Sequence, residues 1–263
     1  MQVDMLQWSL AQFQSFLLIL MRVAPILFLM PLLGSRNIPT LAKIGLTLTV
    51  SLILLSSVKM ESSIFPQEPL SFLAFLGAEL FVGFLLGLAV KIIFAGIQMG
   101  GELVGFQMGL SIAQVIDPQS GTDSSALAEF HYFLGTLIFL AVDGHHWFFR
   151  ALVQSFQVLV PGEIHLRAGL FTAFTTLTGN LFVIAIKLSA PVMTVLLFTQ
   201  ISMGILAKAV PQVNILITSF PITILVGLVF LGFSLDFFLP YFRSLFEETG
   251  RELTGTLLPL MQR

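Results

Sequence analysis

The sequence predicts an all-α, integral membrane-type fold, and three observations support this class. Of the 263 residues, 56% are hydrophobic and only 10% are charged, whereas globular proteins average about 45–50% and 25%. Apolar runs of near 20 residues recur along the chain, and this length spans a hydrocarbon core of about 30 Å. The runs lack the alternation of polar and apolar residues that the strands of a membrane barrel need. We therefore expect each run to be a helix.

The first three predicted helices occupy residues 10–33, 41–58 and 70–97. A turn containing Arg36 separates the first two runs. A polar connection at 59–69 precedes the third run, and the high glycine content that begins within that run continues well beyond it.

The last three predicted helices occupy residues 126–142, 170–198 and 215–239. We expect a polar connection at 143–167 and an amphipathic tail at 241–263. No linker rich in Ser, Gly or Pro is long enough to divide the chain, so residues 1–263 are expected to form one domain.

Four prolines lie in or beside the apolar runs, namely Pro25, Pro31, Pro191 and Pro221. A proline in a regular helix interior costs about 3 kcal/mol. We therefore expect broken helices or hairpins, which a membrane protein tolerates where the freed backbone groups are covered by protein or line a wet cavity.

Five charged residues are predicted to be buried: Arg22, Glu79, Lys91, Glu102 and Lys187. A charge that faces lipid costs about 2.5–3.5 kcal/mol on insertion scales, so these groups must pair, snorkel or face a polar interior. Snorkelling is the alternative for Arg22 and Lys91. The chain also has 27 Phe but only two Trp and two Tyr. The aromatic belts at membrane interfaces consist mainly of Trp and Tyr, so we expect the Phe side chains to be buried against protein.

The segment 96–118, GIQMGGELVGFQMGLSIAQVIDP, is apolar and rich in glycine. In a helix, glycines four residues apart fall on neighbouring turns and form a groove that admits another backbone. Each glycine weakens the helix by about 1 kcal/mol relative to alanine. The segment therefore either packs very tightly or can rearrange. Close helix packing is predicted at Gly83, Gly87, Gly96, Gly100 and Gly101.

Residues Asp143, His145 and His146 are the group most suited to metal or proton chemistry. Adjacent histidines point to different faces of a helix, and no further ligand has a suitable spacing. We predict no metal site, and expect the Gly-His pair to end a helix.

Three carboxylates, Glu102, Asp117 and Glu129, could belong to a proton path. The alternative for Asp117, which precedes Pro118, is that it starts a turn or caps the next helix. No nucleophile elbow and no Gly-rich loop with a following Lys occurs, so neither an enzyme activity nor a cofactor is predicted. Without cysteine there is no thiolate site, and a net charge of −2 without a basic tract predicts no nucleic-acid binding.

Four segments resemble the FliR family of flagellar biosynthetic proteins, which are components of type III secretion export gates. In chain order they read RNIPTLAKIGLTL, GGELVGFQMGLSIAQVIDPQSG, VDGHHW and GILAKAVPQVNILITSFPITILVGL. The resemblance implies a protein of the bacterial inner membrane and the flagellar basal body, with much of the complex on the periplasmic side. It implies assembly with FliP and FliQ into a gate that passes unfolded flagellar export substrates, beside FlhB, FlhA and membrane lipid.

The resemblance also implies a fold and a site. Residues 1–169 would form FliP-like helical hairpins, and 170–263 a FliQ-like helical hairpin and tail. A loop matching about 105–117 would plug the pore through Gly105, Phe106, Met108, Gly109, Leu110, Ile112, Val115 and Asp117. Two alternatives stay open. One is a stand-alone small-molecule transporter or ion channel using Glu79, Lys91 and Glu102, and the other is the equivalent subunit of a virulence secretion system.

Overall fold

The computed structural model describes residues 2–35, 38–58, 65–66, 68–110, 125–159, 161, 168–210, 212 and 215–261. These residues form helices and turns, with no strand among them, which confirms the all-α class. The helices are α1 (Gln2–Leu29), α2 (Thr40–Ser57), α3 (Pro69–Met108), α5 (Ala126–Ala141), α6 (Gly144–Val158), α7 (Ala168–Ala209) and α8 (Ile215–Glu252), followed by the π-helix η3 (Leu253–Leu257) and the short α9 (Leu258–Leu260).

Among the described residues, five helices are long and apolar enough to cross a membrane, namely α1, α2, α3, α7 and α8. Helices α5 and α6 together pass the same test but are bent by 70°. Each of the six apolar runs predicted from the sequence therefore lies mainly in a helix. The fourth run, residues 126–142, corresponds to α5, the first helix of the bent pair.

The long helices are less interrupted than their prolines predict. Pro25 lies inside α1, Pro191 inside α7 and Pro221 inside α8, and each helix continues past its proline. Pro31 lies two residues beyond the end of α1. Helices α3, α7 and α8 contain 40, 42 and 38 residues. The helices therefore do not break at Pro25, Pro191 or Pro221, and membrane helices tolerate a proline where neighbouring groups satisfy the freed backbone.

The break occurs instead between α5 and α6, in a segment predicted to be a polar connection. Asp143 separates the two helices with a left-handed backbone, φ 56°. Residues 144–158 form a helix rather than a loop, which corrects the predicted connection. Helix α6 buries Phe148, Ala151, Leu152, Ser155 and Phe156, a spacing typical of a helix with one apolar face.

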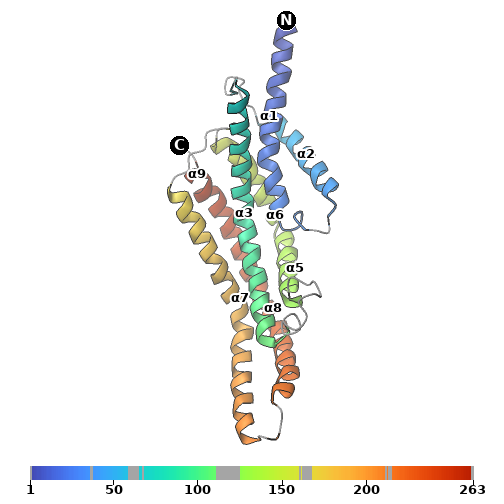
Figure 1. The fold of residues 1–263 in the computed structure, drawn as a ribbon, viewed down its shortest axis with the longest axis vertical. Helices are drawn as coiled ribbons and strands as arrows, with labels where there is room; N and C mark the ends of the chain where they lie inside the picture. The colour runs from blue at the N-terminus through green and yellow to red at the C-terminus, as the bar shows by residue number, and fades with distance from the viewer. Residues whose placement is uncertain are drawn as a thin grey trace. The chain divides into compact units, whose positions relative to one another are not determined.

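The residues form two compact units, and the three longest helices each contribute to both. Unit 1 contains residues 1–91, 143–176 and 247–263. Within it α1 packs beside α2, and η3 and α9 pack on α6 (Figure 1).

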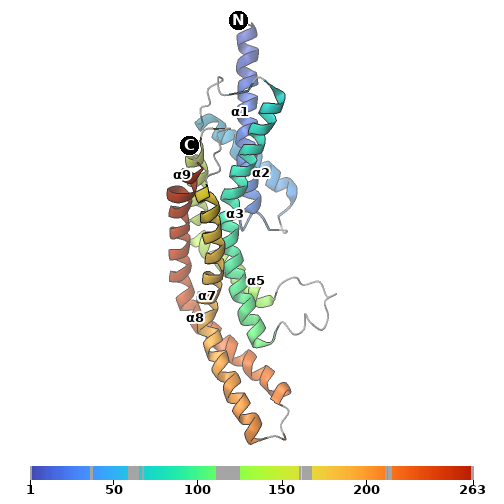
Figure 2. The ribbon, with the colours of Figure 1, turned by 60° about the vertical axis from the view of Figure 1, so that its left-hand side comes forward.

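Unit 2 contains residues 92–142 and 177–246. Within it the second half of α7 lies beside the first part of α8 (Figures 1 and 2). The ring of Phe94 from α3 contacts those of Tyr132 and Phe139 from α5 and Phe246 from α8, with centroids 5.5–5.7 Å apart. Part of the phenylalanine content is thus buried against protein, while Phe198 and Phe233 stay exposed.

Candidate functional site

Glycines on α3 set how closely its second half approaches the other helices of unit 2. A Cβ at Gly96 would lie 2.9 Å from the Leu181 carbonyl oxygen, and one at Gly100 would lie 3.0 Å from a Leu188 methyl, both on α7. A Cβ at Gly101 would lie 2.6 Å from the carbonyl oxygen of Leu127 on α5. Two different faces of one helix therefore use glycine to admit α7 and α5.

Two glycines nearer the start of α3 do the same for α1 in unit 1. A Cβ at Gly83 would collide with the backbone carbonyl of Arg22, and one at Gly87 would lie 3.1 Å from the carbonyl oxygen of Pro25. The backbone of α1 at Arg22 and Pro25 is thereby closely covered by α3.

Helix α3 ends in a Schellman motif around Gly109. The amide of Gly109 donates to the carbonyl of Phe106, and the amide of Leu110 donates to that of Gly105, both at 3.0 Å. Gly109 has φ 84°, a conformation that disfavours side chains. These two bonds are the pair that defines this helix ending.

The residues predicted to form the plug are divided by this helix end. Gly105, Phe106 and Met108 belong to the last turn of α3, so the predicted loop begins later than the sequence suggested. The side chain of Phe106 is 72% exposed, while Met108 is fully buried in its own chain. Leu110 is exposed. The remaining predicted plug residues, Ile112, Val115 and Asp117, lie outside the described residues.

Helix α5 is capped by Ser125. Ser125 precedes the helix and its hydroxyl oxygen accepts a hydrogen bond from the amide of Ala128 at 3.2 Å. A Ser side chain at this position satisfies one of the free amides of the first turn. Both predictions for Asp117, that it starts a turn or caps the next helix, lie outside the described residues.

A fully buried ion pair joins three helices of unit 1. Arg22 on α1 donates from Nε to Glu79 Oε2 on α3 at 2.5 Å, and from Nη2 to Oε1 at 3.0 Å. Its Nη1 also donates to Ser155 Oγ of α6 at 3.2 Å, and the guanidinium carbon lies 4.2 Å from the ring centroid of Phe156. Arg22 and Glu79 are both 0% exposed. Sequence analysis identified the two charges but not this pairing or the contribution of α6.

The other three charges predicted to be buried are not buried within the chain. Lys91 and Glu102 lie on exposed positions of α3, and Lys187 on an exposed position of α7. Their apolar sequence neighbours suggested burial, but each side chain is on the outward face of its helix. Glu129 has interactions of its own, and its role in a proton path with Glu102 stays a prediction.

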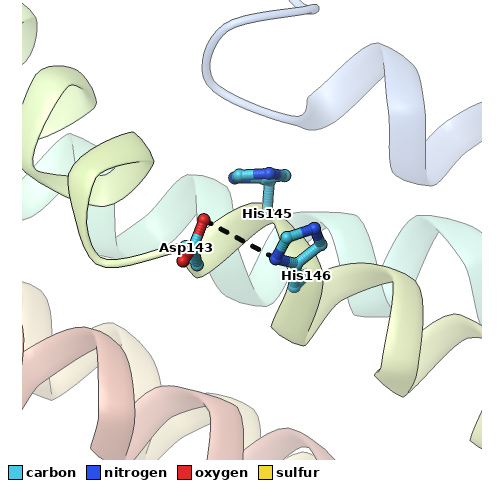
Figure 3. A group of neighbouring side chains, drawn as sticks. All are labelled: Asp143, His145 and His146. Carbon is cyan, nitrogen blue, oxygen red and sulfur yellow. Dashed lines mark ion pairs between the residues drawn. The ribbon is translucent and has the colours of Figure 1, made fainter.

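The histidine pair begins a helix rather than ending one, which corrects the prediction. His145 and His146 lie in the first turn of α6, and Figure 3 shows Asp143 and His146 facing each other. Asp143 Oδ1 lies 3.6 Å from His146 Nδ1. The turn that precedes the pair is at Asp143, whose φ is 56°.

This group could offer one ligand atom from each of Asp143, His145 and His146, all within 4.8 Å of one another. A structural zinc site needs four ligands, and in the described part of the chain no fourth His, Cys, Asp or Glu joins the three. The geometry accounts directly for an Asp–His ion pair at the start of α6.

One buried polar residue, His131 on α5, was not identified from the sequence. It is 0% exposed, its Nδ1 lies 2.8 Å from the carbonyl oxygen of Leu127, and its ring lies 5.4 Å from that of Phe238. Its Nε2 has no hydrogen-bond partner among the described residues. The only sign of His131 in the sequence is a single histidine inside an apolar run. A histidine in such a position is usually a hydrogen-bonded residue of the core.

Comparison with known proteins decides the family. Residues 13–249 match the family described as bacterial export proteins, family 1. The chain belongs to this family. It is 33% identical over 247 residues to the flagellar biosynthetic protein FliR of Bacillus subtilis (strain 168), covering 92% of this chain and 95% of that protein. It is also 30% identical over 265 residues to FliR of Escherichia coli (strain K12), covering 99% and 100%.

The match to the bacterial export family includes the ion pair, the glycine-rich half of α3 and the histidine pair, because all three lie between residues 13 and 249. A third relative, FliR of Pectobacterium carotovorum, is 31% identical over 257 residues, covering 98% of this chain and 96% of that protein. The family resemblance inferred from four short segments is thereby confirmed over nearly the whole chain.

Proposed function

We propose that this chain is a non-enzymatic subunit of the flagellar type III export gate in the bacterial inner membrane. Membership of the bacterial export protein family supports a role in protein export. Relatives named flagellar biosynthetic proteins support a flagellar system rather than a virulence secretion system. Five helices suited to crossing a membrane support the location. We place the gate in the flagellar basal body, with much of the complex on the periplasmic side, and its cargo is unfolded flagellar protein.

The proposed partners are FliP and FliQ within the gate, and FlhB and FlhA beside it. Exposed large apolar side chains on α7 run from Phe182 to Leu206, about 36 Å along the helix at 1.5 Å per residue. That length exceeds a hydrocarbon core of about 30 Å. Only 33% of the most apolar window of α7 and 28% of that of α8 is buried within the chain. Lipid would cover part of this surface and partner subunits the rest.

We further propose that residues 1–169 correspond to a FliP-like part and 170–263 to a FliQ-like part. We also propose that the end of the glycine-rich segment, from the last turn of α3 to residue 117, closes the pore. The observation that carries the plug proposal is the end of α3. The helix ends just before Gly109, and the apolar side chains of Phe106 and Leu110 on either side of this residue are exposed.

Deleting residues 110–115 tests the plug, because this deletion removes the proposed closing segment and leaves α3 intact. We expect the assembled gate to admit small solutes that the unmodified gate excludes. Uptake is measured in cells and normalised to the amount of gate that co-purifies with a tagged partner subunit. The matched control is Phe230→Ala on α8, at a 39% exposed apolar position outside the segment. Uptake equal to that of the control in a fully assembled gate would exclude the plug.

Single cysteines provide an independent test, since the chain has none of its own. A cysteine at Phe106 should cross-link to a stalled export substrate, and one at Phe230 should not. Phe106 suits the purpose because it is exposed, whereas Met108 is buried. Equal cross-linking at both positions would contradict a pore-facing location. Recovery of an active chain without FliP and FliQ would instead favour a stand-alone transporter.

A further inference from the structure

Helices α7 and α8 each contain an uncharged stretch whose length is set by its charged neighbours. In α7 this stretch is 188–207, between Lys187 and Lys208, and in α8 it extends from the helix start at Ile215 to Asp236. All three charged residues are exposed. Each stretch covers about 32 Å at 1.5 Å per residue, which is close to a hydrocarbon core of about 30 Å.

The charges that end the two stretches lie at one level of unit 2. Helices α7 and α8 run antiparallel (Figures 1 and 2). Lys187 lies about 33 Å from the end of α7, and Asp236 lies about 32 Å from the start of α8. Glu102 of α3 is near this level too, because a Cβ two residues earlier, at Gly100, would lie 3.2 Å from the Cβ of Leu188. Three exposed charges from three helices thus mark the same level.

The exposed side chains within the two stretches need no water. Leu197 and Leu225, near the midpoints of the stretches, are 52% and 65% exposed. The exposed hydroxyls of Thr194 and Ser202 donate to backbone carbonyls four residues earlier, at 2.7 and 2.8 Å. The exposed amide of Gln200 bonds to a glutamine of α3 at 3.2 Å. These polar groups are therefore satisfied by protein, as a hydrocarbon environment requires.

Polar groups are exposed on the other side of the charged level. Asn180 of α7 and Arg243 of α8 are both exposed, and each lies seven residues beyond the charge on its own helix, about 10 Å further along. The change from an apolar to a polar surface therefore occurs at the same level on both helices. A charge inside the hydrocarbon core is costly, so this level suits a membrane surface.

We propose that the acyl chains of the bilayer cover the outward face of residues 188–207 and 215–235. Lys187 and Asp236 then lie at one membrane surface, and Lys208 lies at the other. This inference rests on the proposed function, which places the chain in the inner membrane, and it selects the part of the apolar surface that contacts lipid. A partner subunit is the competing occupant. Lipid is favoured because an interface between proteins has no reason to match the core thickness on both helices.

Cysteines at the two ends of the α7 stretch test whether it spans the membrane. In cells that contain the assembled gate, a thiol reagent that cannot cross the inner membrane should label only one of Lys187→Cys and Lys208→Cys. The other should react once the inner membrane is made permeable. Only chain that co-purifies with a tagged partner subunit is counted. Labelling of both cysteines from the same side of the membrane would overturn the inference.

Nitroxide labels on Leu197→Cys and Leu225→Cys test the occupant. The gate is reconstituted in vesicles of phosphatidylethanolamine and phosphatidylglycerol. Contact with lipid predicts frequent collisions with oxygen, which dissolves in acyl chains, and few with a water-soluble nickel chelate. Rare collisions with both would assign the face to a partner subunit, and frequent collisions with the chelate would place it in water. Either result would contradict lipid contact.

Asn180→Cys is the matched control for the boundary, because it is exposed on the same helix beyond Lys187. Its label should show no preference for oxygen over the nickel chelate. A preference equal to that at Leu197 would mean that lipid extends past the charged level, and the proposed boundary would be wrong.

The inference and the proposed function fail separately. If the chain assembles with FliP and FliQ and supports secretion, but the label at Leu197 does not report lipid, the proposed function stands and the lipid face is wrong. If the chain purifies without these partners and does not support secretion, while its labels report lipid, the proposed function fails and the lipid face stands.

Discussion

Replacing Arg22 by methionine should be among the most destabilising single changes in the chain. The substitution keeps a long side chain but removes the two hydrogen bonds to Glu79, the one to Ser155 and the contact with the Phe156 ring. Glu79 would remain 0% exposed beside an apolar side chain. Removing one partner of a buried ion pair costs about 3–5 kcal/mol. We therefore expect Arg22→Met to lower the free energy of unfolding by this amount.

The double variant Arg22→Met with Glu79→Leu isolates the cost of leaving the buried Glu79 carboxylate without Arg22. Replacing both members of a buried pair by apolar residues is often neutral or even stabilising, and Ser155 retains a bond to the Leu152 carbonyl at 2.7 Å. The double variant should thus recover most of the loss, with a coupling energy of about 2 kcal/mol or more between the two sites.

The assay is reversible unfolding in mixed micelles, followed by helical circular dichroism as denaturing detergent is added. Lys91→Met on α3 is the matched control, because it removes a positive charge from an exposed position and should change stability by less than about 0.5 kcal/mol. If Arg22→Met costs no more than Lys91→Met, the ion pair does not stabilise unit 1. If the double variant loses the sum of the two single losses, the uncompensated charge is not the cause.

Three further changes test other parts of the structure, the first two by the same unfolding assay and the third by secretion and co-purification. Gly101→Ala should destabilise the protein by about 1–3 kcal/mol through overpacking, because its Cβ would lie 2.6 Å from the Leu127 carbonyl oxygen. The control Gly77→Ala places a Cβ that meets nothing within 4 Å and should stabilise the protein by up to about 1 kcal/mol. Equal effects of the two substitutions on stability would refute the packing argument. Ser125→Ala should cost about 0.5–2 kcal/mol through the lost helix cap, and Ser125→Asn should restore most of it. His146→Ala should weaken gate assembly mildly and leave export per assembled gate unchanged, with secretion and co-purification measured together; loss of export in a fully assembled gate would point to a chemical role.

Much of the helical architecture could be predicted because it depends on local hydropathy. Runs of about 20 apolar residues have few alternatives to a membrane helix, and all six proved helical. Helix α6 was missed because it contains His145, His146 and Arg150 and is amphipathic rather than uniformly apolar. Its buried residues fall at i, i+3, i+4, i+7 and i+8 from Phe148, so a search for helical periodicity instead of hydropathy would have found it.

The pairing of the charges could not be predicted in the same way. Glu79 and Arg22 are 57 positions apart, and Ser155 is a further 76 positions along the chain. Only the packing of α1, α3 and α6 in unit 1 brings them together. Sequence analysis could state that a carboxylate inside an apolar run needs a partner. It could not choose between Arg22 and the nearer Lys91, which is exposed on the same helix as Glu79.

The spacing of glycines in and after α3 does not by itself show what each glycine does. Gly96 and Gly100 admit α7, Gly101 and Gly105 face α5 and its cap, and Gly109 turns the chain through a positive φ. The recurring four-residue spacing therefore serves close packing at four positions and a change of direction at the fifth. Sequence alone could not separate these uses, because both favour a residue without a side chain. What separates them is whether a Cβ would meet a neighbour, as at Gly101, or strain the backbone, as at Gly109.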